Sequence, residues 1–224
     1  MSRAADNYYA GIRAATRGLW TGALSYDQFF DAMDATIRRG LPQAWHEGAQ
    51  ECGIAPSELS SAEKVGLQQA IVSELNYIDG FATAIEAGSK VNGGKLEPLM
   101  RRANLWIVRY IDVTNRARVK ACADKKLMWV WNPLKEHCTD CAKLNGRVYR
   151  ASTWDRYGLR PQSPDLECKG FKCGCSFAPT DESCTPGRPP SLVGGAGGGF
   201  PSRGGLTMPA VAPGIVPGIV PEVV

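Results

Sequence analysis

Histidine is scarce in this chain of 224 residues, which contains only His46 and His137. A histidine-based metal nuclease or a His-Cys nucleophile pair would have to use one of these two. His46 follows Trp45 in helical sequence, where a surface or packing role is the simpler interpretation. The sequence also lacks a P-loop and a Gly-x-Gly-x-x-Gly run behind a strand. We therefore expect that the protein is not an enzyme.

Long apolar runs are missing as well. The longest are far shorter than the roughly 20 residues that a membrane helix needs, and the first residues form no apolar signal region. We expect no membrane contact, and synthesis in a reducing cytoplasm. The formal net charge of +4 is too small to mark a general binder of polyanions.

The composition divides the chain into three regions. Residues 1–126 have helical periodicity, residues 127–183 combine short strands, turns and cysteines, and residues 184–224 are rich in Gly and Pro. The predicted fold class is α+β. It consists of a mainly α-helical N-terminal bundle, a small zinc-ribbon-like β module and a disordered Gly/Pro-rich tail.

The first region contains three long predicted helices, after a weaker one over residues 5–18. One begins at the N-cap Ser25 and should kink or restart at Pro42. Its expected apolar stripe is Phe30, Met33, Ile37 and Leu41.

The next helix follows a capping box of Ser60 and Glu63, and its apolar stripe runs without a break to about Ala87. The last long helix is expected over residues 96–124. Its predicted buried face is Ala103, Trp106, Tyr110, Val113 and Ala117.

Arg102, Arg109 and Arg116 recur every seven residues in this last helix, so they lie along one side of it. Such a row is either an ordinary solvated helix face or a contact with nucleic acid or an acidic partner.

Eight cysteines are present, and five of them fall between Cys138 and Cys175. A Cys-x-x-Cys turn places two thiolates where both can reach one zinc ion at about 2.3 Å. Our choice of ligands is Cys138, Cys141, Cys168 and Cys173. Cys175 is the first substitute, and His137 remains a candidate. Disulfides and free thiols are the alternatives.

The predicted zinc site is structural, because four thiolates leave no position open for water or substrate. A preceding strand is expected over residues 127–132, and Asn145-Gly146 indicates a hairpin behind the first cysteine pair, as in zinc ribbons. Cys52 and Cys122 stand apart in helical sequence and are interpreted as small buried side chains.

Three segments together resemble the C-terminal module of tailed-phage minor head proteins, the phage Mu F-like head-morphogenesis family. They are residues 136–149 with the Cys-x-x-Cys, the Pro-rich residues 160–164, and residues 168–175 with the final cysteines. Residues 20–30 and 37–40 also resemble the helical body of such proteins. The usual final run often carries histidine in a Pro-x-Cys-x-Cys form, whereas here Cys168 precedes Cys173 by five residues.

The resemblance implies a non-enzymatic structural protein that acts in head morphogenesis, docks at the portal or the inner capsid surface and stays in the virion. The expected partners are portal or major capsid proteins and packaged DNA, with assembly in the host cytoplasm and no small-molecule substrate. A nucleic-acid-binding zinc-ribbon protein involved in DNA packaging or ejection is the alternative. A thiol redox protein is a third class, although no βαβ pattern surrounds the cysteines.

The tail ends in a four-residue apolar repeat, Pro-Gly-Ile-Val, in which proline blocks helix formation. It is either simply disordered or an arm that adds to a partner's edge or groove. In the second case the contacts should come from Ile215, Val216, Ile219 and Val220.

Overall fold

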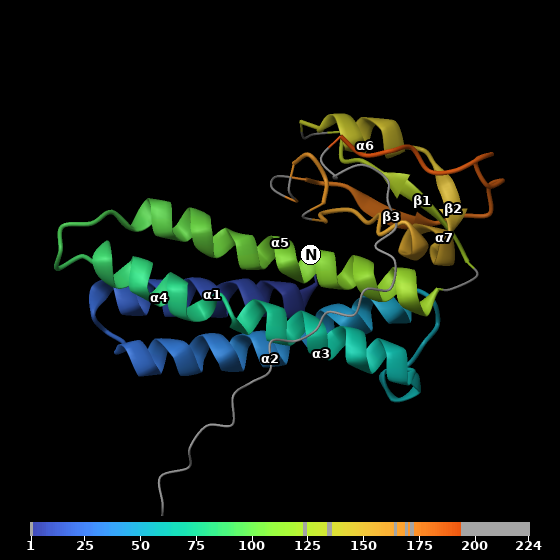
Figure 1. Ribbon diagram of the computed structural model, residues 1–224. Coiled ribbons are helices and arrows are strands. Elements are labelled where there is room, and N and C mark those ends of the chain that lie inside the picture. The colour runs from blue at the N-terminus through green and yellow to red at the C-terminus, as the bar shows by residue number, and fades with distance from the viewer. Residues whose placement is uncertain are drawn as a thin grey trace, which may run out of the picture.

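The computed structural model describes residues 2–122, 125–133, 136–163, 165–168, 170 and 173–193. A bundle of helices forms the body, and a small sheet with two short helices forms a second layer beside the C-terminal half of α5 (Figure 1). This arrangement matches the predicted α+β class, with a helical N-terminal region and a small three-stranded antiparallel sheet accompanied by a cysteine cluster. Among the described residues, no helix has the length and apolar character needed to cross a membrane.

The body begins with α1 (Arg3–Thr21) and α2 (Tyr26–Gln50). Ser25 caps α2 through a capping box with Gln28, as its N-cap position predicts. The helix continues through Pro42, so the predicted restart is wrong. Leu41 and Ala44 are fully buried on either side of this proline, and their packing offsets the missing backbone hydrogen bond.

One residue of the predicted apolar stripe in α2 is exposed and not buried. Phe29 is fully buried, whereas Phe30 is 38% exposed. Phe29 packs edge-on against Phe81 of α4, which explains why the bundle takes this ring and leaves its neighbour outside.

The second predicted helix is two helices, α3 (Ser61–Leu75) and α4 (Ile78–Ala87). The capping box of Ser60 and Glu63 is present. The helical period of the apolar stripe continues across the break at Asn76 and Tyr77. Ile71 before the break and Ile78 after it are both buried. A short 3-10 turn, η1 (Pro56–Glu58), precedes α3.

The longest helix, α5 (Leu96–Ala121), packs on α1, α2 and α3, and its predicted buried face is confirmed. It also reaches beyond the body, because Val119 and Cys122 belong to the apolar core of the second layer. Thus α5 connects the two cores.

The second layer, here called the module, contains the sheet of β1 (Lys126–Val130), β2 (Val148–Arg150) and β3 (Ser176–Pro179). The strand order is β2-β1-β3 and both pairings are antiparallel, with Leu127 opposite Tyr149 and Trp129 opposite Phe177. Trp129, Trp154 and Phe177 fill the core beneath it. The module also holds α6 (Thr139–Leu144) and α7 (Ala151–Arg156).

The hairpin predicted at Asn145-Gly146 is wrong. The residues before Asn145 form α6, so this turn connects a helix to β2. Gly146 takes a φ of 74°, which explains the strong turn signal without a second strand.

Cys52 and Cys122 are buried as predicted, but they are joined in a disulfide and are not free thiols. Cys52 follows α2 and Cys122 caps α5, and the two Cα atoms lie 5.2 Å apart. The sequence pattern of separate helices did not show that their ends meet.

Residues 184–193, the expected start of the tail, run along the module. The Thr185 amide donates to the Val148 carbonyl, and Leu192 packs on the module core.

Candidate metal centre

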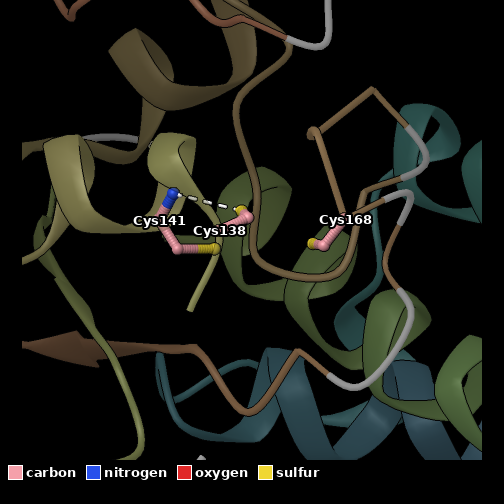
Figure 2. A group of neighbouring side chains, drawn as sticks. All are labelled: Cys138, Cys141 and Cys168. Carbon is pink, nitrogen blue, oxygen red and sulfur yellow. Dashed lines mark hydrogen bonds between the residues drawn. The ribbon is translucent and has the colours of Figure 1, made fainter. Parts of the chain in front are cut away.

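The first two cysteines lie at the start of α6. Cys138 is the N-cap, with an extended backbone, and its Sγ accepts a hydrogen bond of 3.4 Å from the Cys141 amide. A sulfur that accepts from the first turn of a helix is held in place by the backbone itself. Figure 2 shows this bond, and it shows the sulfurs of Cys138, Cys141 and Cys168 around a common space.

The other three cysteines come from the long connection between α7 and β3. Two triplets of sulfurs each lie within 4.8 Å of one another: Cys138, Cys141 and Cys168, and Cys141, Cys173 and Cys175. The Sγ atoms of Cys141 and Cys173 are 3.7 Å apart. Two thiolates on one tetrahedral zinc ion lie about 3.8 Å apart, so this separation suits shared ligation.

Cys141 belongs to both triplets, so all five cysteines gather around it. The five are free of disulfide bonds. This cluster can hold a metal ion such as zinc, and the predicted set of Cys138, Cys141, Cys168 and Cys173 draws on both triplets. Since a zinc ion takes four ligands, one thiol remains over, and in the predicted set this thiol is Cys175.

His137 belongs to neither triplet. Its ring stacks on that of Trp131, with the centroids 4.4 Å apart and the planes 14° from parallel. Among the described residues, the groups with metal-binding geometry therefore consist of cysteine alone.

The surroundings shift the pKa values of Cys168 and Cys173 in opposite directions. Hydrogen bonds from Cys141 and then Cys175 lower the pKa of Cys173, since both donors stabilise its thiolate. Burial raises the pKa of the Cys168 thiol to about 12. Several thiolates in one buried site repel one another, so a cation among them would offset this repulsion.

Gln162 positions the cysteines that precede β3. Its side-chain amide donates to the carbonyls of Cys173 and Cys175, at 3.2 and 3.3 Å. Gln162 itself takes a φ of 65°, and Gly170 lies so close that a Cβ there would be 2.4 Å from the Gln162 carbonyl oxygen. The turn behind Cys168 therefore needs a glycine at this point.

Asp140, between the first two cysteines, is fully buried and connects three segments. Its carboxylate accepts from the amides of Glu167 and Val193, at 2.9 and 2.6 Å. The Glu167 carboxylate in turn accepts from the Thr139 amide at 2.7 Å. The reasoning from sequence missed Asp140, Glu167 and Gln162. The only available signal was an acid inside the Cys-x-x-Cys turn, which is also common on solvated helix starts.

No family model matches the chain, and neither a curated protein nor a solved structure matches it.

The predicted arginine row divides in the structure. Arg102 is exposed, with its guanidinium 5.2 Å from the centre of the Phe81 ring. Arg109 and Arg116 both turn to the buried Asp112, at 3.7 and 3.1 Å. The predicted arm residues Ile215, Val216, Ile219 and Val220 lie outside the described residues.

Proposed function

We propose that this protein is a structural, non-enzymatic minor head protein of a tailed phage that acts in head morphogenesis. The observation that supports the proposal best is the meeting of the cysteines. The segments that resemble the Mu F-like family, residues 136–149 and 168–175, are far apart in sequence and bring their thiols to one buried cluster. This convergence is what a single metal-binding unit built from the two segments requires.

The metal in this proposal is a structural zinc ion bound by four of the five thiolates. A closed set of thiolates offers no free coordination position, so the ion would hold the fold together and would not activate a substrate. The module has a small core and a sheet of short strands, and a domain of this size gains much of its stability from such a metal.

In this proposal the helical body and the zinc-bound module dock at the portal or the inner capsid surface, and the protein remains in the phage head. The partners are portal and major capsid proteins, and assembly takes place in the host cytoplasm. The exposed Trp131 and Tyr157, at 37% and 38%, are large side chains on the module that such a contact would cover.

Co-assembly tests this function. The full-length, metal-loaded chain should co-purify with heads or portals when it is co-expressed with the portal and major capsid proteins of the same phage genome. The Trp131→Ala variant should bind less well, whereas Val91→Ala, an exposed apolar residue before α5, should not. A chain that binds its metal and yet stays apart from portals and heads would refute the proposal.

The alternative is a nucleic-acid-binding role in DNA packaging or ejection, which the basic residues of α5 favour. It predicts DNA affinity that falls steeply with salt, because each neutralised phosphate releases counterions. Arg102 is the residue of the row that is free to reach DNA, since Arg109 and Arg116 contact Asp112. Arg102→Ala should then reduce the salt dependence of binding.

A further inference from the structure

A cavity lies where the module meets the body, away from the cysteine cluster. It has a volume of about 170 Å³ and lies between α5, α3 and the segment around α7. Figure 1 shows α7 beside the C-terminal half of α5. The walls include the fully buried Trp45 and Trp154, and the charged side chains on its lining are Arg116, Lys120, Asp155 and Arg160.

Positive charge dominates this cavity. Arg116 and Lys120 lie one turn apart on α5, and Arg160 approaches from the other layer. Asp155, the only acid among the described residues of the lining, accepts a hydrogen bond of 3.5 Å from Lys120 at the outer edge, where both side chains are well exposed. The two arginines are much less exposed, at 31% and 20%.

A buried carboxylate orients both arginines. Asp112 is 1% exposed, and its two oxygens accept from the Nε atoms of Arg116 and Arg160, at 3.1 and 2.7 Å. Arg109 also approaches this carboxylate, at 3.7 Å. Three guanidinium groups thus surround one charge, and burial followed by the repulsion from Arg160 and Arg109 lowers the pKa of Arg116 although Asp112 opposes this.

The terminal Nη atoms of Arg116 and Arg160 remain available to bind a ligand. Only their Nε atoms bind Asp112, and the Nη groups of Arg116 and Arg160 donate no hydrogen bond to another described residue. A guanidinium that is fixed through Nε presents its two Nη atoms as a planar fork, which matches the oxygens of a phosphate group.

We propose that this cavity is a binding site for a single phosphate group, held by the Nη atoms of Arg116 and Arg160 and by the Lys120 ammonium. A phosphate fits better than a carboxylate, because two forks and an ammonium offer more donors than two oxygens can accept. The volume is several times that of one water molecule, so a phosphate can enter without moving the walls. The site would join body and module through the ligand, and it is independent of the proposed zinc ion.

Isothermal titration calorimetry of the full-length, metal-loaded chain with inorganic phosphate tests this site. We expect one saturable site for phosphate. Arg160→Lys and Arg116→Lys should each bind phosphate about tenfold more weakly, because lysine keeps a positive charge beside Asp112 but lacks the planar fork of Nη atoms. Arg102→Lys is the matched control, since it makes the same change on the same helix outside the cavity, and its affinity should equal that of the unaltered chain.

The Lys120→Gln variant shows whether phosphate binding can be weakened without any loss of folding. Lys120 does not contact Asp112, so this variant should unfold at an unchanged temperature without phosphate and still bind phosphate several-fold more weakly. Titration with a nucleoside monophosphate separates two sources of the ligand. Tighter binding than inorganic phosphate assigns the terminal phosphate of a nucleotide, and equal binding assigns the free ion. Lack of saturable binding, equal affinities in all variants, or tighter binding of succinate would each overturn the proposal.

Discussion

Cys141 is the one cysteine that both sulfur triplets share. Its Sγ lies 3.7 Å from that of Cys173, and its amide holds the Cys138 sulfur. Removal of this thiol therefore affects both triplets, whereas removal of Cys168 or Cys175 affects only one triplet.

We predict that Cys141→Ser abolishes zinc binding, and that Cys168→Ser and Cys175→Ser differ. One of these two should keep about one zinc ion per chain, and the other should lose it. Native mass spectrometry before and after a chelator measures the metal content. Cys184→Ser removes an exposed thiol outside the cluster and serves as the control. Full zinc content in Cys141→Ser would contradict the assignment of the site.

Residue types predicted the gathering of the cysteines better than their exact arrangement. The Cys-x-x-Cys spacing fixes a local geometry, so the proximity of Cys138 and Cys141 could be predicted from sequence. The positions of Cys168, Cys173 and Cys175 depend on the turns at Gln162 and Gly170, which only tertiary contacts specify. The structural role of Asp140 could not be predicted for the same reason, since the amides that it binds belong to remote segments.

At the scale of elements, α1 and α2 pack closely at Gly40. A Cβ at this position would meet Cδ2 of Tyr8 at 2.2 Å. Tyr8 is itself buried and lies against Tyr9 and Tyr110, so its ring has little room to move.

Gly40→Ala should therefore lower the free energy of unfolding by about 1–3 kcal/mol, even though alanine is the better helix former. Gly80, inside α4, is the matched control because a Cβ there meets nothing within 4 Å. Gly80→Ala should raise the free energy of unfolding by up to about 1 kcal/mol. Urea denaturation monitored by circular dichroism measures both, and equal effects would show that the contact with Tyr8 is not limiting.

Glu74, near the end of α3, makes the stability of the body depend on pH. Burial raises its pKa from 4.5 to about 7, and the ion pair with Arg109, at 3.8 Å, opposes the shift. The folded chain thus binds a proton more tightly than the unfolded chain does. Stability should be highest below the unfolded pKa and should fall as the pH rises from 4.5 to about 7.

Glu74→Gln should remove this fall, so the variant should exceed the unaltered chain in stability at about pH 8 and not at about pH 4. Urea denaturation across this pH range measures the difference. Glu97→Gln, which alters an exposed carboxylate on α5, should leave the pH profile as it is. A profile that Glu74→Gln does not change would show that another group titrates.

Amphipathic elements were the predictable part of the fold. The capping box at Ser60 and the buried face of α5 follow from local sequence, and both are observed. The break at Tyr77 could not be predicted from the sequence, because the apolar residues keep one helical period on both sides of it. The short α6 was missed because six residues are too few to show a helical period, and its start coincides with the Cys-x-x-Cys turn.

At the scale of the whole molecule, two apolar cores meet along α5. The body core draws on all its long helices, whereas three of the five clustered cysteines lie in the module core and the other two pack against it. The two parts should respond differently to metal removal.

A chelator should make residues 127–183 sensitive to limited proteolysis while most of the helical circular dichroism remains, because the body core does not include the cluster. Peptide mapping of the cleavage products measures this. The Cys184→Ser variant should behave as the unaltered chain does. Simultaneous loss of both parts would show that they fold as one cooperative unit.

The disulfide between Cys52 and Cys122 turns residues 52–122 into a covalent ring that contains α3, α4 and α5. A nick in the exposed residues 55–58 would open this ring without releasing a fragment, and only a reductant would then separate the two pieces. The ring also limits the conformations of the unfolded chain, which for a loop of this length is worth about 4 kcal/mol. Such a bond persists in oxidising surroundings and is lost in reducing ones, so this molecule would be more robust outside a reducing compartment than inside it.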